Sequence, residues 1–128
     1  MNLHRVGLLH AAWNRTPERA AARASQVTAL PLVTQAPALA RECEVILLIS
    51  VADDDALSQV IERMQPHLGA GKVVVDTSTV SAETACAAAA QVAAVGSAFL
   101  DAPVSGGVEG AAGIIRDCLA NYLHGAGR

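Results

Sequence analysis

The stretch that decides the fold is Val73-Val74-Val75-Asp76-Thr77-Ser78-Thr79. Its three valines predict a short strand that is buried on both faces of a sheet, and its polar end predicts the turn that follows. Ser81 then precedes an alanine-rich stretch that runs to about Gly96, which predicts a long helix capped by the serine hydroxyl. A strand, a polar turn and a helix in this order form the repeating unit of a parallel α/β sheet.

Two further units of the same kind flank this stretch. The apolar run from Val45 to Val51 predicts a second strand buried on both faces, and Asp53-Asp54-Asp55 opens a helix after it. On the other side, Ala98-Phe99-Leu100 predicts a strand that ends at Asp101. The central part of the chain therefore predicts parallel strands that alternate with helices.

The N-terminal part predicts one more unit. Leu8 to Trp13 is a strand candidate, and a helix follows from Thr16 to about Ser25, with Thr16 as its N-cap and Pro17 as its first residue. A weaker strand near Val27 to Leu30 and a short helix around Pro37 to Arg41 complete this region. No repeat or linker divides the chain, so we expect a single domain.

Composition narrows the possible functions. The chain has 128 residues, of which 52% are hydrophobic and 16% charged, as in one globular domain. Only 2% are aromatic and the net charge is −3, which argues against nucleic-acid and anionic-membrane partners. The apolar stretch from Val45 to Ala52, which is interrupted only by Ser50, is too short to span a bilayer. Cys43, Cys86 and Cys118 are widely spaced, so we expect no metal site, no disulfide framework and a cytoplasmic location.

Polar or small residues follow each predicted strand. In parallel sheets, ligands bind outside the carboxyl ends of the strands. The stretches to consider are Asn14-Arg15-Thr16, Val51-Ala52, Asp76 to Thr79 and Asp101 to Gly107. Because all four belong to the same edge of the sheet, they jointly predict a ligand site there.

The tripeptide Asn14-Arg15-Thr16 stands where dinucleotide-binding units read the adenosine ribose. An acidic residue at this position bonds the 2′-hydroxyl of NAD, whereas the donors of Arg15 suit a 2′-phosphate. From the tripeptide alone, a helix cap beside a solvated arginine is the simpler interpretation.

The hydroxyl residues of Asp76-Thr77-Ser78-Thr79 are small enough to approach a ribose or a nicotinamide amide. A turn that leads to the Ser81 cap is the simpler explanation for this stretch alone. Neither Ser78 nor Ser105 lies in a Gly-x-Ser-x-Gly sequence, and no histidine is suitably placed, which argues against a serine hydrolase.

The most informative stretch is Asp101-Ala102-Pro103-Val104-Ser105-Gly106-Gly107. Consecutive glycines leave backbone N–H groups open to an anion, and the Ser105 hydroxyl is a further donor. A flexible loop is the alternative. The order of strand, proline, serine and glycines favours a site for a substrate carboxylate.

Three stretches together, Trp13 to Glu18, Asp76 to Thr79 and Asp101 to Gly107, resemble the β-hydroxyacid dehydrogenase family. That family includes 3-hydroxyisobutyrate dehydrogenase, 2-hydroxy-3-oxopropionate reductase and the NADP-binding domain of 6-phosphogluconate dehydrogenase. The resemblance implies an α/β fold with a Rossmann-like, doubly wound parallel sheet. It also implies hydride transfer between the CH–OH group of a short 3-hydroxy acid and NAD(P).

The resemblance also assigns residues to the site. Cofactor contacts fall on Asn14, Arg15, Thr16, Val51, Ala52 and Thr79. The substrate carboxylate falls on Ser105, Gly106 and Gly107. NADP is the implied cofactor, with NAD as the alternative, and a small hydroxy acid is the implied substrate.

The ends of the chain depart from the family pattern. The family opens with a strand and a Gly-x-Gly-x-x-Gly loop before the helix that receives the pyrophosphate. Here Asn2 to Gly7 matches the end of that helix, so we expect residues 1–112 to form a domain without its first strand and glycine loop. Residues 113–128 form a divergent tail, and the family's catalytic lysine and asparagine belong to a further domain. Lys72, the sole lysine, is expected to be a solvated turn residue, and no catalytic residue is assigned.

Two functions from different classes follow. The first is a truncated NADP-linked dehydrogenase, inactive by itself. The second is a non-enzymatic binding module that self-associates through its open sheet. A short-chain dehydrogenase is excluded because Tyr122 has Ala126, and no lysine, four residues later.

The chain itself is expected to bind NADPH only weakly, because its 128 residues hold no Gly-x-Gly-x-x-Gly sequence to bind the pyrophosphate. Titration calorimetry should give a Kd weaker than about 1 µM, which corresponds to roughly 8 kcal/mol of binding free energy. A micromolar or tighter Kd would contradict this expectation.

Overall fold

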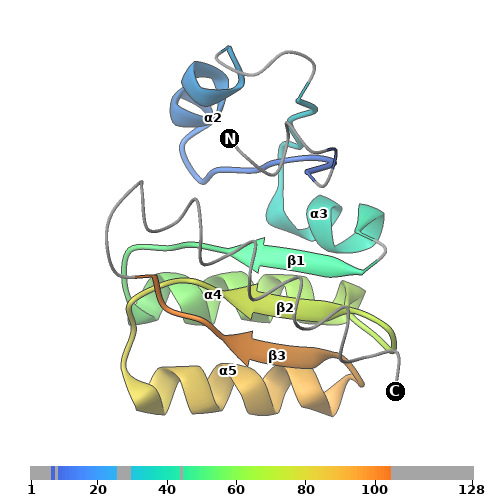
Figure 1. Cartoon of the computed structure of the whole chain (residues 1–128), viewed down its shortest axis with the longest axis vertical. Helices are drawn as coiled ribbons and strands as arrows, with labels where there is room; N and C mark the ends of the chain where they lie inside the picture. Colours follow the sequence, from blue (N-terminus) through green and yellow to red (C-terminus); the bar gives the residue numbers. More distant parts are fainter. Residues whose placement is uncertain (1–6, 8, 26–29, 44, 105–128) are drawn as a thin grey trace.

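Three parallel strands form the sheet in the order β1-β2-β3: β1 (Ile46–Ile49), β2 (Val73–Asp76) and β3 (Ala98–Asp101) (Figure 1). The structure is a computed structural model, and it describes residues 7, 9–25, 30–43 and 45–104. Ile49 is paired with Asp76, and Asp76 with Asp101, so the three strands end level with one another. The predicted α/β fold with a parallel sheet is confirmed.

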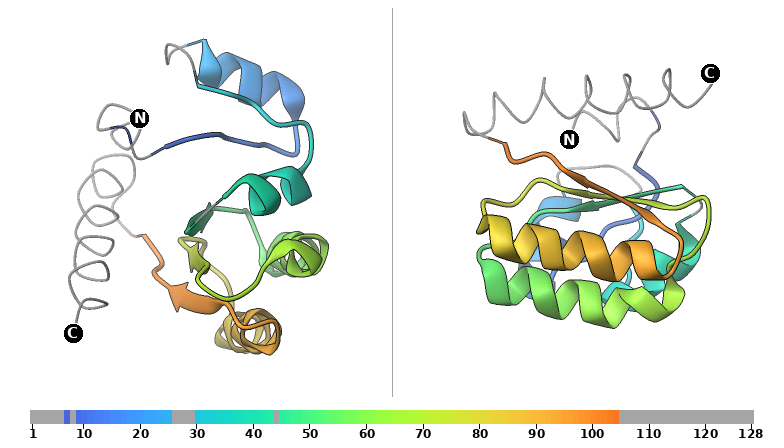
Figure 2. Two further views of the ribbon diagram at one scale, coloured as in Figure 1. Left: turned by 90° about the vertical axis from the view of Figure 1, so that its right-hand side faces the viewer. Right: turned by 90° about the horizontal axis from the view of Figure 1, so that it is seen from below.

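Three helices lie on one face of this sheet: α3 (Ala36–Glu42), α4 (Asp54–Met64) and α5 (Ala82–Ala94) (Figure 2). A short 3-10 helix, η1 (Gln65–His67), continues α4, and α2 (Pro17–Ala24) lies farther from the sheet. Helices α4 and α5 each connect one strand to the next parallel strand. The structure therefore contains the two predicted strand–helix–strand units.

Residues with capping or terminating properties set the helix ends. The Asp53 carboxylate accepts a hydrogen bond from the Ala56 N–H, and the Ser81 hydroxyl accepts one from the Thr84 N–H. Gly96 has a φ of +82° just after α5, a conformation that glycine adopts without strain. The predicted start of α4 at Asp53 to Asp55, the predicted Ser81 cap of α5 and the predicted end near Gly96 are confirmed.

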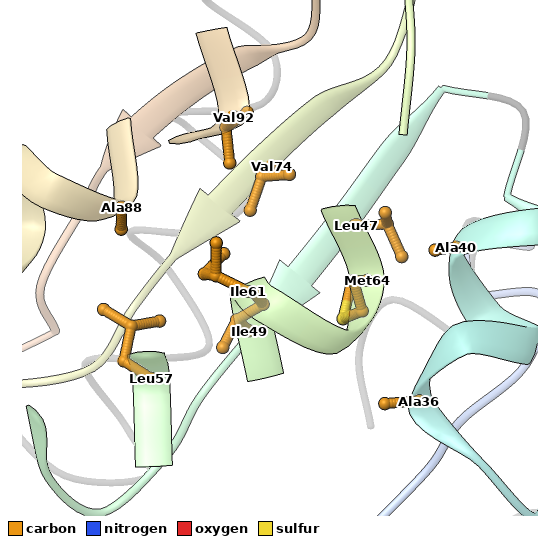
Figure 3. Packing of buried hydrophobic residues seen from close by; sticks show 10 residues of the cluster. All are labelled: Ala36, Ala40, Leu47, Ile49, Leu57, Ile61, Met64, Val74, Ala88 and Val92. Carbon is orange, nitrogen blue, oxygen red and sulfur yellow. The ribbon is translucent and has the colours of Figure 1, made fainter. Parts of the chain in front are cut away.

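The core lies between the sheet and these three helices (Figure 3). Leu57 and Ile61 of α4 are fully buried against Val74 of the central strand. Burying each such side chain contributes about 1.5–3 kcal/mol. The small side chains of Ala36 and Ala40 in α3 and of Ala88 in α5 let these two helices approach the sheet closely. The rest of the buried cluster consists of Ala36, Ala40, Leu47, Ile49, Met64, Ala88 and Val92.

Strand β1 differs from its prediction. Leu47 and Ile49 are buried in the core, but Leu48 between them is 36% exposed; Val45, which precedes the strand, is 45% exposed. Alternate residues of a strand point to opposite faces, and α3 and α4 pack only on the face of Leu47 and Ile49. Within the described residues, the expectation that β1 is buried on both faces is therefore wrong. In β2, by contrast, Val73 and Val75 are buried as well as Val74.

The first predicted strand is reduced to a single bridge between Ala12 and Leu32. Ala12 donates to the Pro31 carbonyl and accepts from the Val33 N–H. The next bond of a parallel ladder would need an N–H at Pro31, and proline has none. The predicted strand from Leu8 to Trp13 is therefore wrong over its described part, and residues 27–29 of the next strand candidate lie outside the described residues.

Lys72 corrects another expectation. This half-buried residue lies directly before β2, and its ammonium donates to the carbonyl of His67, at 3.1 Å, and to the carbonyl of Ala40. Ala40 is in the last turn of α3 and His67 ends η1, where helix carbonyls lack partners within their own helix. Lys72 therefore joins two helix ends and is not a solvated turn residue.

Replacement of Lys72 should destabilise the fold. Lys72→Met keeps the aliphatic stem but leaves the carbonyls of Ala40 and His67 without this donor, so we expect a loss of about 1–3 kcal/mol in the free energy of unfolding. Urea denaturation measures it. Arg63→Met is the matched control, because Arg63 is an exposed cation in the last turn of α4. Equal stability of the two variants would show that the Lys72 bonds contribute nothing.

Candidate functional site

The carboxyl ends of the three strands form one rim of the molecule. Strand β1 leads to Val51 and Ala52, β2 leads to Thr79, and β3 leads to residues 102–104. In Figure 1 the three arrowheads point to the same side, and the blue segment that leads into α2 ends on that side as well. The described parts of the four predicted stretches therefore share one edge.

A hydrogen-bond network joins the first two of these loops. The Ser78 hydroxyl donates to Asp76 Oδ1, at 2.5 Å, and accepts from the Val51 N–H, at 2.9 Å. Asp76 Oδ1 also accepts from the Ser78 N–H, and the Thr77 hydroxyl donates to the Ile49 carbonyl. The loops after β1 and β2 are thus held side by side by side chains as well as by the sheet.

The assigned residues of these loops offer a small, mostly open surface. Val51 is half-buried and packs against the core, whereas Ala52 and Thr79 are exposed. Since none of the three has a large side chain, they leave room for a ring such as a ribose or a nicotinamide to approach the backbone.

Asn14-Arg15-Thr16 forms a turn that starts α2. Asn14 Oδ1 accepts a hydrogen bond from the Thr16 N–H at 2.9 Å, and the Thr16 carbonyl accepts from the N–H groups of Arg19 and Ala20. Arg15 is exposed and forms no hydrogen bond or ion pair with the described residues. The tripeptide therefore starts the helix, as the simpler interpretation expects, and the role of Arg15 at a ligand stays a prediction.

The loop after β3 lies beside the end of β2 and the first residue after it. Its Ala102 N–H donates to the Asp76 carbonyl at 2.8 Å, and its Val104 N–H donates to the Thr77 carbonyl at 3.4 Å. Ser105, Gly106 and Gly107 lie outside the described residues, so their predicted role at the substrate carboxylate stays a prediction.

The N-termini of α4 and α5 at this rim are occupied by side chains of the protein. Asp53 caps α4, and Asp54 Oδ1 accepts from the Ser81 N–H at 2.9 Å. Hydrogen bonds from the side chain and backbone of Ser81 lower the pKa of Asp54 below its ordinary value of 3.8. Asp54 is therefore a carboxylate at neutral pH.

These acids bear on how a dinucleotide would fit. Two negative side chains at the start of α4, with Asp55 beside them, oppose an anion there. The described residues include exposed or half-buried side chains at both positions that the resemblance assigns to the nucleoside ends, at Arg15 and at the loops of Val51 and Thr79. They offer no cradle for its pyrophosphate at either helix.

Sequence reasoning missed the roles of Asp76, Ser78 and Lys72. Asp76 is fully buried, and within the described residues nothing donates to its Oδ2. The spacing Asp-x-Ser at a strand end is a turn signal, because aspartate often bonds the N–H two residues later. That signal could have identified the Asp76–Ser78 pair, but not its bond to Val51.

Two other features, a metal-ligand cluster and a membrane-spanning helix, are absent from the described residues. The described part of the chain contains no group of three or more His, Cys, Asp or Glu side chains that could hold a metal ion. None of its helices is long and apolar enough to cross a membrane.

Comparisons with solved structures agree with this fold. A 3-hydroxyisobutyrate dehydrogenase of Mycobacterium tuberculosis, solved with L-serine, superposes with a TM-score of 0.78 at 25% identity, over 87% of this chain and 37% of that one. A 3-hydroxyisobutyrate dehydrogenase of Salmonella typhimurium gives 0.72 at 28% identity, over 87% and 39%. An imine reductase of Streptomyces aurantiacus gives 0.65 at 30% identity, over 77% and 33%.

Comparisons of sequence give the family. An uncharacterized oxidoreductase of Shewanella frigidimarina is 45% identical over 69 residues, which are 52% of this chain and 24% of that protein. The chain thus spans about a quarter of this curated relative. The profile of the NAD-binding domain of 6-phosphogluconate dehydrogenase matches residues 1–114. This protein therefore belongs to the family of the NAD-binding domain of 6-phosphogluconate dehydrogenase.

Proposed function

We propose that this chain is the NADP-binding part of an oxidoreductase that acts on the CH–OH group of a short 3-hydroxy acid. The observation that carries the cofactor assignment is the exposed guanidinium of Arg15, which bonds none of the described residues and belongs to the Asn14 turn at the start of α2. When bound, the nicotinamide would accept or donate a hydride. The residues of this chain would bind and orient the cofactor rather than move a proton.

Arg15 favours NADP over NAD for an electrostatic reason. A guanidinium donates two parallel hydrogen bonds to a phosphate, and such charge-assisted bonds are about twice as strong as neutral ones. The described residues place no carboxylate in contact with Arg15, so its charge is available to a ligand. A solved relative, Psf3, contains NADP+ and superposes with a TM-score of 0.74 at 30% identity, which supports this assignment.

The substrate class rests on the stretch after β3. Two relatives in the comparisons are 3-hydroxyisobutyrate dehydrogenases, and one of them was solved with L-serine, itself a short 3-hydroxy acid. Ser105, Gly106 and Gly107 would supply the hydroxyl and backbone donors for the carboxylate of such an acid. An imine substrate without a carboxylate would leave these donors unused, so we favour hydroxy acids over the imine-reductase alternative.

A second candidate function is a non-enzymatic module that self-associates. Its support is the exposure of Leu48 in β1 and of Val45 just before it; among the described residues, β1 pairs only with β2. An edge strand with free N–H and C=O groups is a template for pairing with a second copy.

Replacement of Arg15 should discriminate between the cofactors. Arg15→Ala removes the donors to the 2′-phosphate, so NADPH affinity should fall by about 1–3 kcal/mol, or roughly 5- to 150-fold, while NADH affinity stays the same. NMR titration measures both Kd values even when binding is weak. Arg63→Ala, an exposed arginine in the last turn of α4 and hence at the opposite edge of the sheet, is the matched control. Equal losses for NADPH and NADH would remove the NADP assignment.

Sedimentation of the purified chain tests the second candidate. If β1 pairs with a second copy, the chain should sediment as a dimer, and Leu48→Lys should shift it toward the monomer, because charged side chains block edge pairing. Glu62→Lys introduces the same side chain at an exposed position of α4, with a larger change in charge, and should leave the dimer intact. A stable monomer at all concentrations would leave this function without support.

A further inference from the structure

The Ser78 hydroxyl is the point where the loops after β1 and β2 meet. Ser78 is only 3% exposed, and its oxygen is bonded on both sides, to Asp76 Oδ1 at 2.5 Å and to the Val51 N–H at 2.9 Å. A buried hydroxyl with two such partners is unavailable to a ligand. Its role must therefore act through the groups that it holds.

The direction of the two bonds follows from their chemistry. The Val51 N–H can only donate, so the Ser78 oxygen must accept from it. The single proton of the hydroxyl is then directed to Asp76 Oδ1, which also accepts from the Ser78 N–H at 3.0 Å. The Val51 N–H therefore donates to Ser78, and the Ser78 hydroxyl in turn donates to Asp76.

Asp76 provides a second, independent observation. Its side chain is fully buried, and within the described residues its Oδ2 accepts no hydrogen bond. A buried carboxyl oxygen without a partner costs stability. A pair of apolar residues at positions 76 and 78 would avoid that cost, so packing alone does not account for the pair.

These hydrogen bonds affect the backbone of Val51 and Ala52. The sheet fixes β1 only as far as Ile49, whose carbonyl accepts from the N–H and the hydroxyl of Thr77. Beyond Ile49, the Val51 N–H donates to the Ser78 hydroxyl, and Asp53 then caps α4. Without this bond, the Val51 N–H would lose its acceptor, and the packing of the Val51 side chain against the core would have to hold the backbone between Ile49 and Asp53.

We propose that Ser78, anchored by Asp76, is a positioning residue that sets the backbone of Val51 and Ala52 for the dinucleotide. This inference rests on the proposed function, since those two residues are assigned to the cofactor there. It differs from the role of Arg15 in a measurable way: Ser78 acts on the part common to NADPH and NADH, whereas Arg15 acts on the 2′-phosphate.

Amide hydrogen exchange and cofactor titration of the full chain test the proposal together. In Ser78→Ala the Val51 N–H loses its acceptor, so its exchange should become at least about tenfold faster. The Kd values for NADPH and NADH should rise by the same factor, about three- to tenfold. If Ser78→Ala does not fold, Ser78→Cys takes its place, because a thiol has a similar shape and is a weak hydrogen-bonding group.

The matched control is Thr77→Val. Thr77 is also a buried hydroxyl residue after β2, but its hydroxyl bonds the Ile49 carbonyl, which keeps the Thr77 N–H as a second donor. This variant should lose comparable stability, with Val51 exchange and both Kd values unchanged within about twofold. A purely structural role for Ser78 would make the two variants behave alike.

The outcomes separate this inference from the proposed function. Unchanged Val51 exchange in the Ser78 variant, or faster exchange with unchanged Kd values, would overturn the positioning role while leaving the proposed function intact. If the parent chain binds neither NADPH nor NADH even at millimolar concentrations, the proposed function and the positioning role both fail. The exchange rates then show whether the bond from Val51 to Ser78 exists at all.

Discussion

The parallel pairing of β1 with β2, in register from Ile46↔Val73 to Ile49↔Asp76, is the constraint on which the rest of the structure depends. Because paired strands end level, the loops that leave them begin side by side, and Thr77 and Ser78 can reach Ile49 and Val51. The pairing also presents Leu47, Ile49 and Val74 to the same face, where α4 buries Leu57 and Ile61 against them. A slip of one residue would turn these side chains to the opposite face and separate the loops.

The two edges of the sheet differ in how their polar groups are used. At the amino edge, Lys72 bonds the ends of α3 and η1, and the Ser97 hydroxyl donates to the Gly69 carbonyl and accepts from the Gly69 N–H. At the carboxyl edge, Arg15 and Thr79 are exposed and Asp76 Oδ2 lacks a donor within the described residues. Polar groups satisfied by the protein stabilise a fold, whereas groups left open are typical of ligand sites.

Much of the fold could be predicted from local sequence. Strands β2 and β3 and helices α3, α4 and α5 lie within one or two residues of their expected positions, because apolar runs, Asp53, Ser81 and Gly96 define their limits. The prediction failed at Ala12, where Pro31 stops the ladder, and at Leu48, which is exposed on a face that α3 and α4 do not cover. Both failures depend on which segments pack beside a strand, and the residues of the strand itself do not specify these segments.

The candidate site divides in the same way. By itself, the sequence determined the order of strands and helices, the caps, the family, and that Asn14-Arg15-Thr16, Val51-Ala52 and Thr79 follow strand ends, because each depends on residues close together in the chain. Only the tertiary structure decided that Ser78 holds Val51 and that Lys72 holds Ala40, pairs that lie 27 and 32 residues apart. A hydrogen bond needs donor and acceptor within a few tenths of an ångström of the right distance. For residues so far apart, that distance is set by how helices and strands pack, and no local pattern specifies it.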